Sequence, residues 1–179
     1  MRLPAAALLL AAGTLASPAC GYSLAGRGSF LPAHIQTVGV PQLVNRTTFF
    51  DVEQILTEKV RSEFIGRGKY RIVPDTAGVD AILSGEVLGI YVQPVGFTDA
   101  QLASRYLFTL TMKVAFTDAR TNEVLWSNES LTFREEYELA TRGNVALQGE
   151  AFLDQERAAF DRIATDIART VVTAILEAF

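Results

Sequence analysis

The chain has 179 residues and a formal net charge of −4, and 49% of its residues are hydrophobic. This length suffices for one domain with its own core, and a mildly acidic chain without a dense basic block argues against nucleic acid as the main partner. A single cysteine excludes an internal disulfide, and with one histidine the sequence holds no spaced ligand set for zinc.

The first residues have the pattern of a secretory signal peptide. Arg2 precedes an apolar run from Leu3 to Leu15, and small residues then lead to Cys20. A run of ~13 residues falls short of the about 20 that span a bilayer. We therefore predict a signal peptide over residues 1–19 and a mature chain that begins at Cys20, with acyl chains such as palmitate on its sulfur.

Lipidation of Cys20 competes with a simpler interpretation, an incidental cysteine after ordinary signal cleavage. Ser17 and Pro18 depart from the usual lipoprotein box. A free thiol in an oxidising compartment is a liability, however, and acylation removes it. Since two acyl chains already hold a protein stably on a membrane, we favour a lipid anchor. Loss of the leader with Arg2 changes the net charge from −4 to −5.

The remainder of the chain divides into a short lead and one domain. Residues 20–33 contain glycines and Pro32 and are predicted to form a lipidated, flexible lead. Residues 34–179 are predicted to form a single α+β domain. It opens with a strand over residues 35–40, which Pro41 ends.

The apolar period becomes helical from Phe49. Thr47 or Thr48 is a natural N-cap for this helix, and Gly66 or Gly68 supplies its end. The three- and four-residue spacing of its apolar residues predicts one buried stripe. That stripe consists of Val52, Ile55, Leu56, Val60 and Phe64.

Alternation of apolar and polar residues predicts four further strands. They cover residues 69–73, 81–92, 105–117 and 123–137. In the second of them, Leu83, Val87 and Tyr91 share one face. Residues 93–104 are predicted as an exposed loop, and residues 118–122 as a hairpin turn.

The strand over residues 105–117 has the cleanest alternation in the sequence. Its even-numbered apolar residues face one way, while Thr109, Thr111 and Lys113 face the other. It therefore provides the largest apolar surface against which helices could pack.

The last predicted strand changes phase. Val124 and Trp126 are even-numbered, whereas Leu131 and Phe133 are odd-numbered. A period of two cannot bury both pairs on one face, so we predict a β-bulge within residues 128–130. The alternative is that the strand leaves the core there and offers its other face elsewhere.

The chain ends with a long amphipathic pattern. Residues 141–149 are predicted as a loop, and residues 149–178 as a helix with an apolar stripe. The order strand, helix, strands, helix predicts an α+β fold, with two helices packed on one face of a mixed four- to five-stranded sheet.

Residues for catalysis are sparse. His34 begins a strand, and a Ser-His-Asp arrangement around it stays open, although no nucleophile motif accompanies it. A surface histidine is the alternative. Glu135 and Glu136 are adjacent, so they lie on opposite strand faces and are poorly placed as an acid–base pair. We predict no enzyme activity, no cofactor and no metal site.

One basic cluster merits attention. It consists of Lys59, Arg61, Arg67, Lys69 and Arg71. Guanidinium and ammonium groups make charge-assisted bonds to phosphoryl oxygens, and period two puts Lys69 and Arg71 on the same side of their strand. Arg67, Lys69 and Arg71 are therefore candidate phosphate ligands. The alternative is a solvated helix end and edge strand, where lysine discourages aggregation.

Several short segments follow one another in a characteristic order. They are Cys20-Gly21-Tyr22-Ser23-Leu24, residues 35–41, Asn45, Leu56-Thr57-Glu58, residues 70–73, Asp80-Ala81 and Leu83-Ser84-Gly85. This order resembles that of the LptE-like lipopolysaccharide-assembly lipoproteins. The resemblance runs from Cys20 to about Gly85, and the hairpin and final helix agree in layout only.

The resemblance implies a non-enzymatic role at the periplasmic face of the outer membrane. Members of this family insert into the β-barrel protein LptD as plug and assembly factor, and they bind lipopolysaccharide on its way to the cell surface. The phosphates would then be those of lipopolysaccharide. We expect contacts with the barrel from residues 93–104, 118–122 and 141–149.

A second class of function shares much of this pattern: lipoproteins that activate a peptidoglycan synthase or support a secretion channel. Such proteins often carry a long linker across the periplasm. Here about thirteen residues separate Cys20 from the first strand, a reach of roughly 40 Å when extended. This short reach keeps the domain near its membrane and favours the barrel plug.

Overall fold

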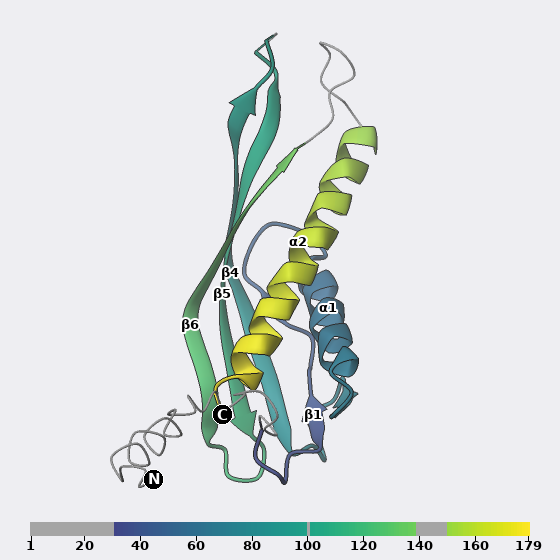
Figure 1. The fold of residues 1–179 in the computed structure, drawn as a ribbon, viewed down its shortest axis with the longest axis vertical. Coiled ribbons are helices and arrows are strands. Elements are labelled where there is room, and N and C mark those ends of the chain that lie inside the picture. Colours follow the sequence, from purple (N-terminus) through teal and green to yellow (C-terminus); the bar gives the residue numbers. More distant parts are fainter. Residues whose placement is uncertain (1–30, 100, 139–149) are drawn as a thin grey trace, which may run out of the picture.

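The fold is an open mixed sheet with two helices on one face (Figure 1). The computed structural model describes residues 31–99, 101–138 and 150–179, the side chains of residues 150–155 excepted. Its elements are β1 (Thr37–Gly39), β2 (Val44–Asn45), α1 (Val52–Gly66), β3 (Arg71–Val73), β4 (Ala81–Phe97), β5 (Ala103–Asp118), β6 (Val124–Glu138) and α2 (Glu150–Leu176). The predicted α+β class and the placement of both helices are confirmed, and the sheet has six strands instead of the four to five expected.

The sheet combines a short parallel part with a long antiparallel part. The strand order is β3-β1-β4-β5-β6, and β1 runs parallel to both β3 and β4. The two-residue strand β2, which the sequence pattern did not predict, pairs with β4 further along the same edge. Beyond that point β4 pairs with β5 alone among the described strands.

A carboxylate organises the start of the parallel part. Asp80 Oδ2 accepts hydrogen bonds from the backbone N–H groups of Thr37, at 2.8 Å, and Gln36, at 3.0 Å. These two bonds, the one from Thr37 first, lower the pKa of Asp80. The side chain thereby fixes the point at which β1 joins β4.

Helix α1 begins later than predicted. The N-cap position is Asp51, at φ 63° and without a side-chain capping bond, so the prediction of Thr47 or Thr48 is wrong. The preceding loop is held by Asn45 instead: its Nδ2 donates to the Phe49 carbonyl at 2.7 Å, and its Oδ1 accepts from the Thr47 N–H at 2.9 Å. The Thr47 hydroxyl also donates to Asn45 Oδ1 at 2.8 Å and accepts the Phe49 N–H at 3.2 Å, so it is engaged within the loop instead of capping the helix.

The hairpin of β4 and β5 is longer than predicted. Residues 93–104 were expected as a loop, but β4 continues to Phe97 and β5 begins at Ala103. Pro94 is tolerated there because this part of β4 is an edge, where a missing N–H need not break the sheet ladder. The hairpin consequently projects past the N-terminal end of α2 (Figure 1).

A bulge in β4 moves the side chains beyond it to the opposite faces. The β4–β5 register shifts between Val87 and Gly89. Leu83 and Val87 are buried as predicted, but Ile90 takes the next inward position, and Tyr91 is 71% exposed. The prediction that Tyr91 shares the buried face is therefore wrong.

The other two patterns in the antiparallel part are confirmed. In β5 the apolar residues Phe108, Leu110, Met112, Val114 and Phe116 are all buried. Met112 of β5 pairs with Leu131 of β6, whereas Val114 of β5 pairs with Asn128, so the register between the two strands shifts at this point. The extra residue lies within the predicted range 128–130.

The two helices complete the core against β4 and β5. The apolar stripe of α1 is buried at Val52, Leu56, Val60 and Phe64, and that of α2 at Ile163, Ile167, Val171 and Ile175. Lys59 on α1 also pairs with Asp161 on α2, with Nζ and Oδ2 2.7 Å apart. Within the described ranges neither helix is long and apolar enough to cross a membrane. The predicted loop 141–149 lies outside the described residues.

Candidate functional site

The three phosphate candidates lie where α1 connects to β3, and all are exposed. Arg67 Nη2 is 2.8 Å from both Glu63 Oε1 and Thr173 Oγ1. Arg71 Nε donates to Thr37 Oγ1 at 3.3 Å. β3 begins only at Arg71, so strand alternation does not fix the direction of Lys69. Cys20 lies outside the described residues.

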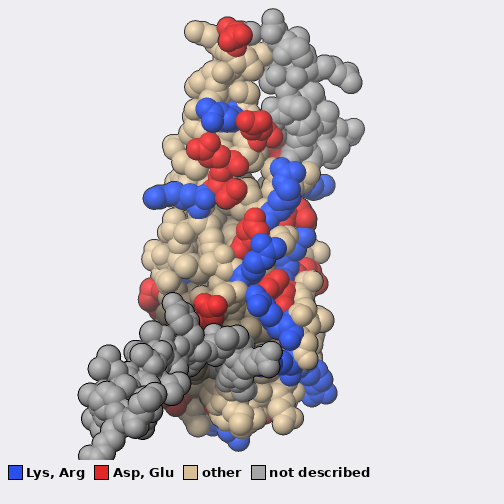
Figure 2. Space-filling model, viewed as in Figure 1, with Lys and Arg blue, Asp and Glu red and all other residues tan. Residues whose placement is uncertain are grey.

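Acidic partners offset the rest of the basic cluster. Lys59 pairs with Asp161, and Arg61 pairs with Glu58 while donating twice to the Val40 carbonyl. Figure 2 shows basic and acidic side chains interleaved over the side of the molecule on which α1 lies. Such a mixed surface is a weaker anion attractant than five unpaired cations.

His34 has an acidic partner, as a catalytic histidine would. Its Nε2 lies 2.6 Å from Asp118 Oδ2, and Asp118 Oδ1 accepts the backbone N–H groups of Arg120 and Thr121. These bonds, the one from Arg120 foremost, hold the pKa of Asp118 low. The side-chain hydrogen bonds of His34 within the described chain go to Asp118 alone. The pair ties the segment before β1 to the β5–β6 turn.

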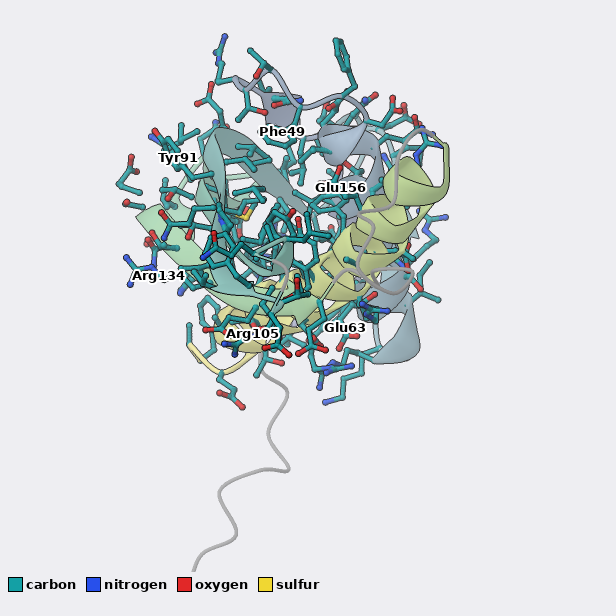
Figure 3. All side chains as sticks on the ribbon, turned by 90° about the horizontal axis from the view of Figure 1, so that it is seen from above. Phe49, Glu63, Tyr91, Arg105, Arg134 and Glu156 are labelled. Atoms are coloured by element: carbon teal, nitrogen blue, oxygen red, sulfur yellow. The ribbon has the colours of Figure 1, made fainter. Side chains whose placement is uncertain are left out.

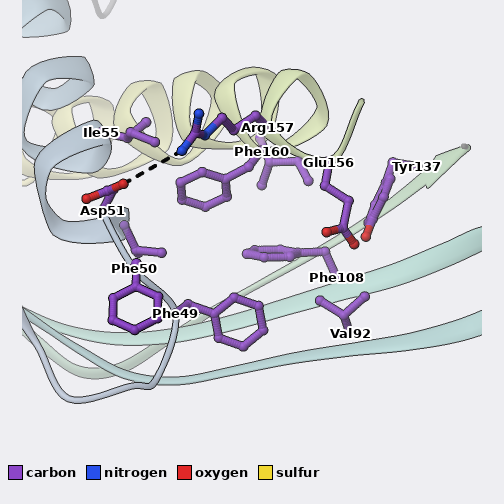
Figure 4. Close-up of a pocket in the computed structure, with 12 residues that line it drawn as sticks. Phe49, Phe50, Asp51, Ile55, Val92, Phe108, Tyr137, Glu156, Arg157 and Phe160 are labelled. Atoms are coloured by element: carbon purple, nitrogen blue, oxygen red, sulfur yellow. Dashed lines mark ion pairs between the residues drawn. The ribbon is translucent and has the colours of Figure 1, made fainter. Parts of the chain in front are cut away.

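A pocket of about 480 Å³ opens between the start of α1, the N-terminal half of α2 and strands β4, β5 and β6 (Figure 4). Most of its wall is apolar. The lining residues are Phe49, Phe50, Asp51, Val52, Ile55, Val92, Phe108, Tyr137, Glu156, Arg157, Phe160 and Ile163. The volume falls within the range of about 300–1,000 Å³ typical of small-molecule sites.

Aromatic rings from separate elements shape the pocket. Phe108 of β5 and Phe160 of α2 lie with ring centroids 5.7 Å apart, and Tyr137 of β6 stacks on Tyr106 of β5 at 5.6 Å. Phe49, from the loop before α1, forms a further wall (Figure 4). Two strands, helix α2 and the loop before α1 thus contribute aromatic rings to the wall or directly behind it.

The polar groups inside the pocket satisfy each other. The side chains of Tyr137 and Glu156 are hydrogen-bonded, and their tips meet at one end of the pocket (Figure 4). Burial raises the pKa of Glu156, and burial together with the charge of Glu156 raises the pKa of Tyr137 to about 12. Both shifts favour the protonated form of the side chain relative to the same group in water.

At its mouth the pocket is spanned by a weak ion pair. Arg157 Nη2 of α2 lies 4.0 Å from Asp51 Oδ2, and the two side chains are 77% and 63% exposed. Such an exposed pair contributes about 0–1 kcal/mol. Beside it Phe50 is 91% exposed, so an apolar ring also stands at the rim.

The sequence carried two signals of this pocket, and neither entered the prediction. Glu156 follows Leu153 by three residues and precedes Phe160 by four, so a carboxylate occupies a position on the apolar stripe of α2. The adjacent Phe49 and Phe50, directly before a helix, were a second signal. Neither shows which strands would complete the walls.

Glu156→Gln is expected to reduce the pH dependence of stability. Because the pKa of Glu156 is raised above its ordinary 4.5, the folded chain holds the proton more tightly than the unfolded chain. Stability is therefore lost as pH rises from about 4.5 through the raised value. The uncharged variant should melt about 2 °C above the parent at about pH 8, and no higher than the parent at about pH 4.

Thermal melts of both proteins at the two pH values check this prediction. Glu138→Gln, at an exposed position on β6, is the control and should change the melting temperature equally at both pH values. An equal change for Glu156→Gln would contradict the prediction.

The opposite face of the sheet points outward and is largely polar. Thr111 and Thr132 hydroxyls lie 3.3 Å apart, and Lys113 Nζ is 2.6 Å from Glu129 Oε2. Tyr91 and Arg134, both paired with Thr109, lie on this face, whereas Glu156 lies on the helix side (Figure 3). The predicted outward direction of Thr109, Thr111 and Lys113 is consistent with their partial exposure.

By its architecture this is an α+β domain with one polar sheet face and an apolar pocket beneath two helices. The family model described as LptE, lipopolysaccharide-assembly, matches residues 35–175. The chain therefore belongs to the LptE family.

Solved structures with low sequence identity align with most of this chain. Protein XCC0632 from Xanthomonas campestris aligns with a TM-score of 0.52 and 16% identity, over 80% of this chain and 85% of that one. Rare lipoprotein B from Shewanella oneidensis gives 0.49 and 11%, over 78% and 93%. Lipoprotein B from Nitrosomonas europaea gives 0.48 and 14%, over 88% of each. Among curated protein sequences none matches this chain.

Proposed function

We propose that this protein is a lipoprotein anchored through acyl chains on Cys20 to the periplasmic face of the outer membrane. There it plugs the LptD barrel, assists its assembly and takes part in lipopolysaccharide transport to the cell surface. Membership of the LptE family is the observation that carries this proposal. The role is one of binding, without catalysis.

The outward sheet face supports contact with a barrel lumen. The interior of a transmembrane barrel is polar, and the outward row of Thr109, Thr111 and Lys113 offers hydroxyl and ammonium groups to such a wall. The projecting β4–β5 hairpin and the turn at residues 118–122 are further contact candidates. The third, residues 141–149, lies outside the described chain.

Affinity purification from an outer-membrane extract tests the proposal. The tagged, lipidated chain should retain LptD, and Cys20→Ser should move the chain from the membrane fraction to the periplasmic fraction. Recovery of a peptidoglycan synthase or a secretion channel in place of LptD would support the rival class instead. A chain that stays membrane-bound after Cys20→Ser would contradict the lipid anchor.

Charge reversal tests the three phosphate candidates. Lys69→Glu combined with Arg71→Glu should weaken lipopolysaccharide binding about tenfold, since two exposed charge contacts are lost and replaced by repulsion. Arg67→Glu should add to the loss. Arg120→Glu combined with Arg134→Glu, two exposed cations elsewhere, is the matched control. Unchanged binding in the first double variant would remove these residues from the site.

A further inference from the structure

We infer that the pocket between α1, α2 and the sheet binds a single acyl chain of an anionic lipid, with Arg157 at the mouth receiving the headgroup. This inference deepens the proposed function, on which its choice of lipid rests: the acyl chain is one from lipopolysaccharide.

The walls select an apolar occupant. Rings and aliphatic side chains from three strands, both helices and the loop before α1 converge on the space. Among the described lining residues, the side chains with hydrogen-bonding groups inside the pocket are Tyr137 and Glu156, and they already bond to each other. A peptide backbone or a sugar would enter with unsatisfied donors and acceptors and would be penalised. An acyl chain has no hydrogen-bond donors or acceptors and so avoids this penalty.

The rim selects a negative headgroup. The ion pair of Arg157 with Asp51 is long and exposed, so Arg157 can exchange that carboxylate for a phosphate at little cost. The guanidinium lies next to the opening, while the acyl chain would extend inward past Phe160 toward Val92 (Figure 4).

The test uses decyl phosphate as a monomeric probe and the full chain downstream of the leader, residues 20–179. Cys20→Ser keeps the protein's own acyl chains from competing. Methyl-labelled Ile and Val residues report the location by NMR. We expect shifts at Ile55, Val92 and Ile163 and none at Val124, which is 56% exposed and outside the pocket. Shifts spread over the exposed apolar residues instead would overturn the inference.

Filling the pocket should abolish binding. Val92→Phe is expected to weaken the affinity for decyl phosphate at least about tenfold, whereas Val95→Phe, on the same strand but outside the lining, should leave it within about twofold. Ile55→Phe is a second filling variant, should Val92→Phe fail to fold. A folded filling variant that binds like the parent would overturn the inference.

The headgroup is tested separately. Arg157→Gln should weaken decyl phosphate about fivefold and leave decanol unchanged, and Arg162→Gln, on the same helix and exposed, should affect neither. Equal losses for both probes would overturn the role of Arg157.

Competition against bound decyl phosphate identifies the lipid. Lipopolysaccharide should displace the probe at lower concentration than phosphatidylglycerol vesicles, and the reverse order would overturn the assignment to lipopolysaccharide. Co-purification of LptD, measured with the parent and with the filling variants, tests the proposed function independently of lipid binding in the pocket. If LptD is retained while the parent fails to bind decyl phosphate, the pocket inference fails and the proposed function stands.

Discussion

Phe64→Ala should lower the free energy of unfolding by about 3–5 kcal/mol. Phe64 is fully buried on α1 and belongs to the core that joins both helices to β4 and β5. Removal of the ring forfeits its transfer free energy and leaves a cavity that the surrounding strands fill only in part. Since a whole domain is stable by about 5–15 kcal/mol, this one change takes a large fraction of the total.

Chemical denaturation of the parent and variant gives the difference directly. The neighbouring Ile65→Ala is the matched control: Ile65 is on the same helix but 61% exposed, so its truncation should change stability by no more than about 0.5 kcal/mol. Similar losses from the two variants would show that α1 packs differently.

Gly39→Ala should cost about 2–3 kcal/mol, although it adds a single methyl group. A Cβ at Gly39 would lie 2.4 Å from the Asp75 carbonyl oxygen and 3.2 Å from Val79 Cγ2. The first of these is backbone and cannot rotate away. β1 is paired on both sides, with β3 and β4, so it cannot shift without breaking sheet bonds.

Gly66→Ala provides the matched comparison for Gly39→Ala. Gly66 is the last residue of α1, and within the described chain no atom outside its neighbours and the adjoining helix backbone lies within 4 Å of the position that its Cβ would take. Alanine favours the helix, so stability should stay the same or rise by up to about 1 kcal/mol. Denaturant midpoints of the two variants decide the point. If Gly39→Ala left the free energy of unfolding unchanged, the backbone at Asp75 would have to move to make room for the methyl group, and the prediction would be wrong.

Several residues that carry the family resemblance have structural roles. Asp80 receives the N–H groups at the start of β1, and Asn45 holds the loop before α1. Gly85 leaves room for Leu43, whose Cδ2 would lie 2.8 Å from an added Cβ. These residues support a scaffold. The pocket, by contrast, is lined mainly by residues outside those matching segments, so the resemblance did not indicate it.

The amino-acid sequence by itself determined the two helices, the longer strands and most of their buried faces. The alternation in β5 predicted its inward residues, and the change of phase between Trp126 and Leu131 predicted the bulge in β6. Both follow from local geometry, because side-chain direction in a strand depends on neighbours two residues away. The buried stripes of the two helices were equally predictable, because the helical period also relates residues that are close in the sequence.

Only the tertiary structure decided which distant residues meet. The bulge at Leu88, which buries Ile90 and exposes Tyr91, depends on the register with β5, and the two-residue strand β2 exists only through β4. The pocket likewise joins Phe49 and Glu156 across more than a hundred residues. Packing between elements, and not the local period, sets these contacts, so periodicity along the chain could not predict them.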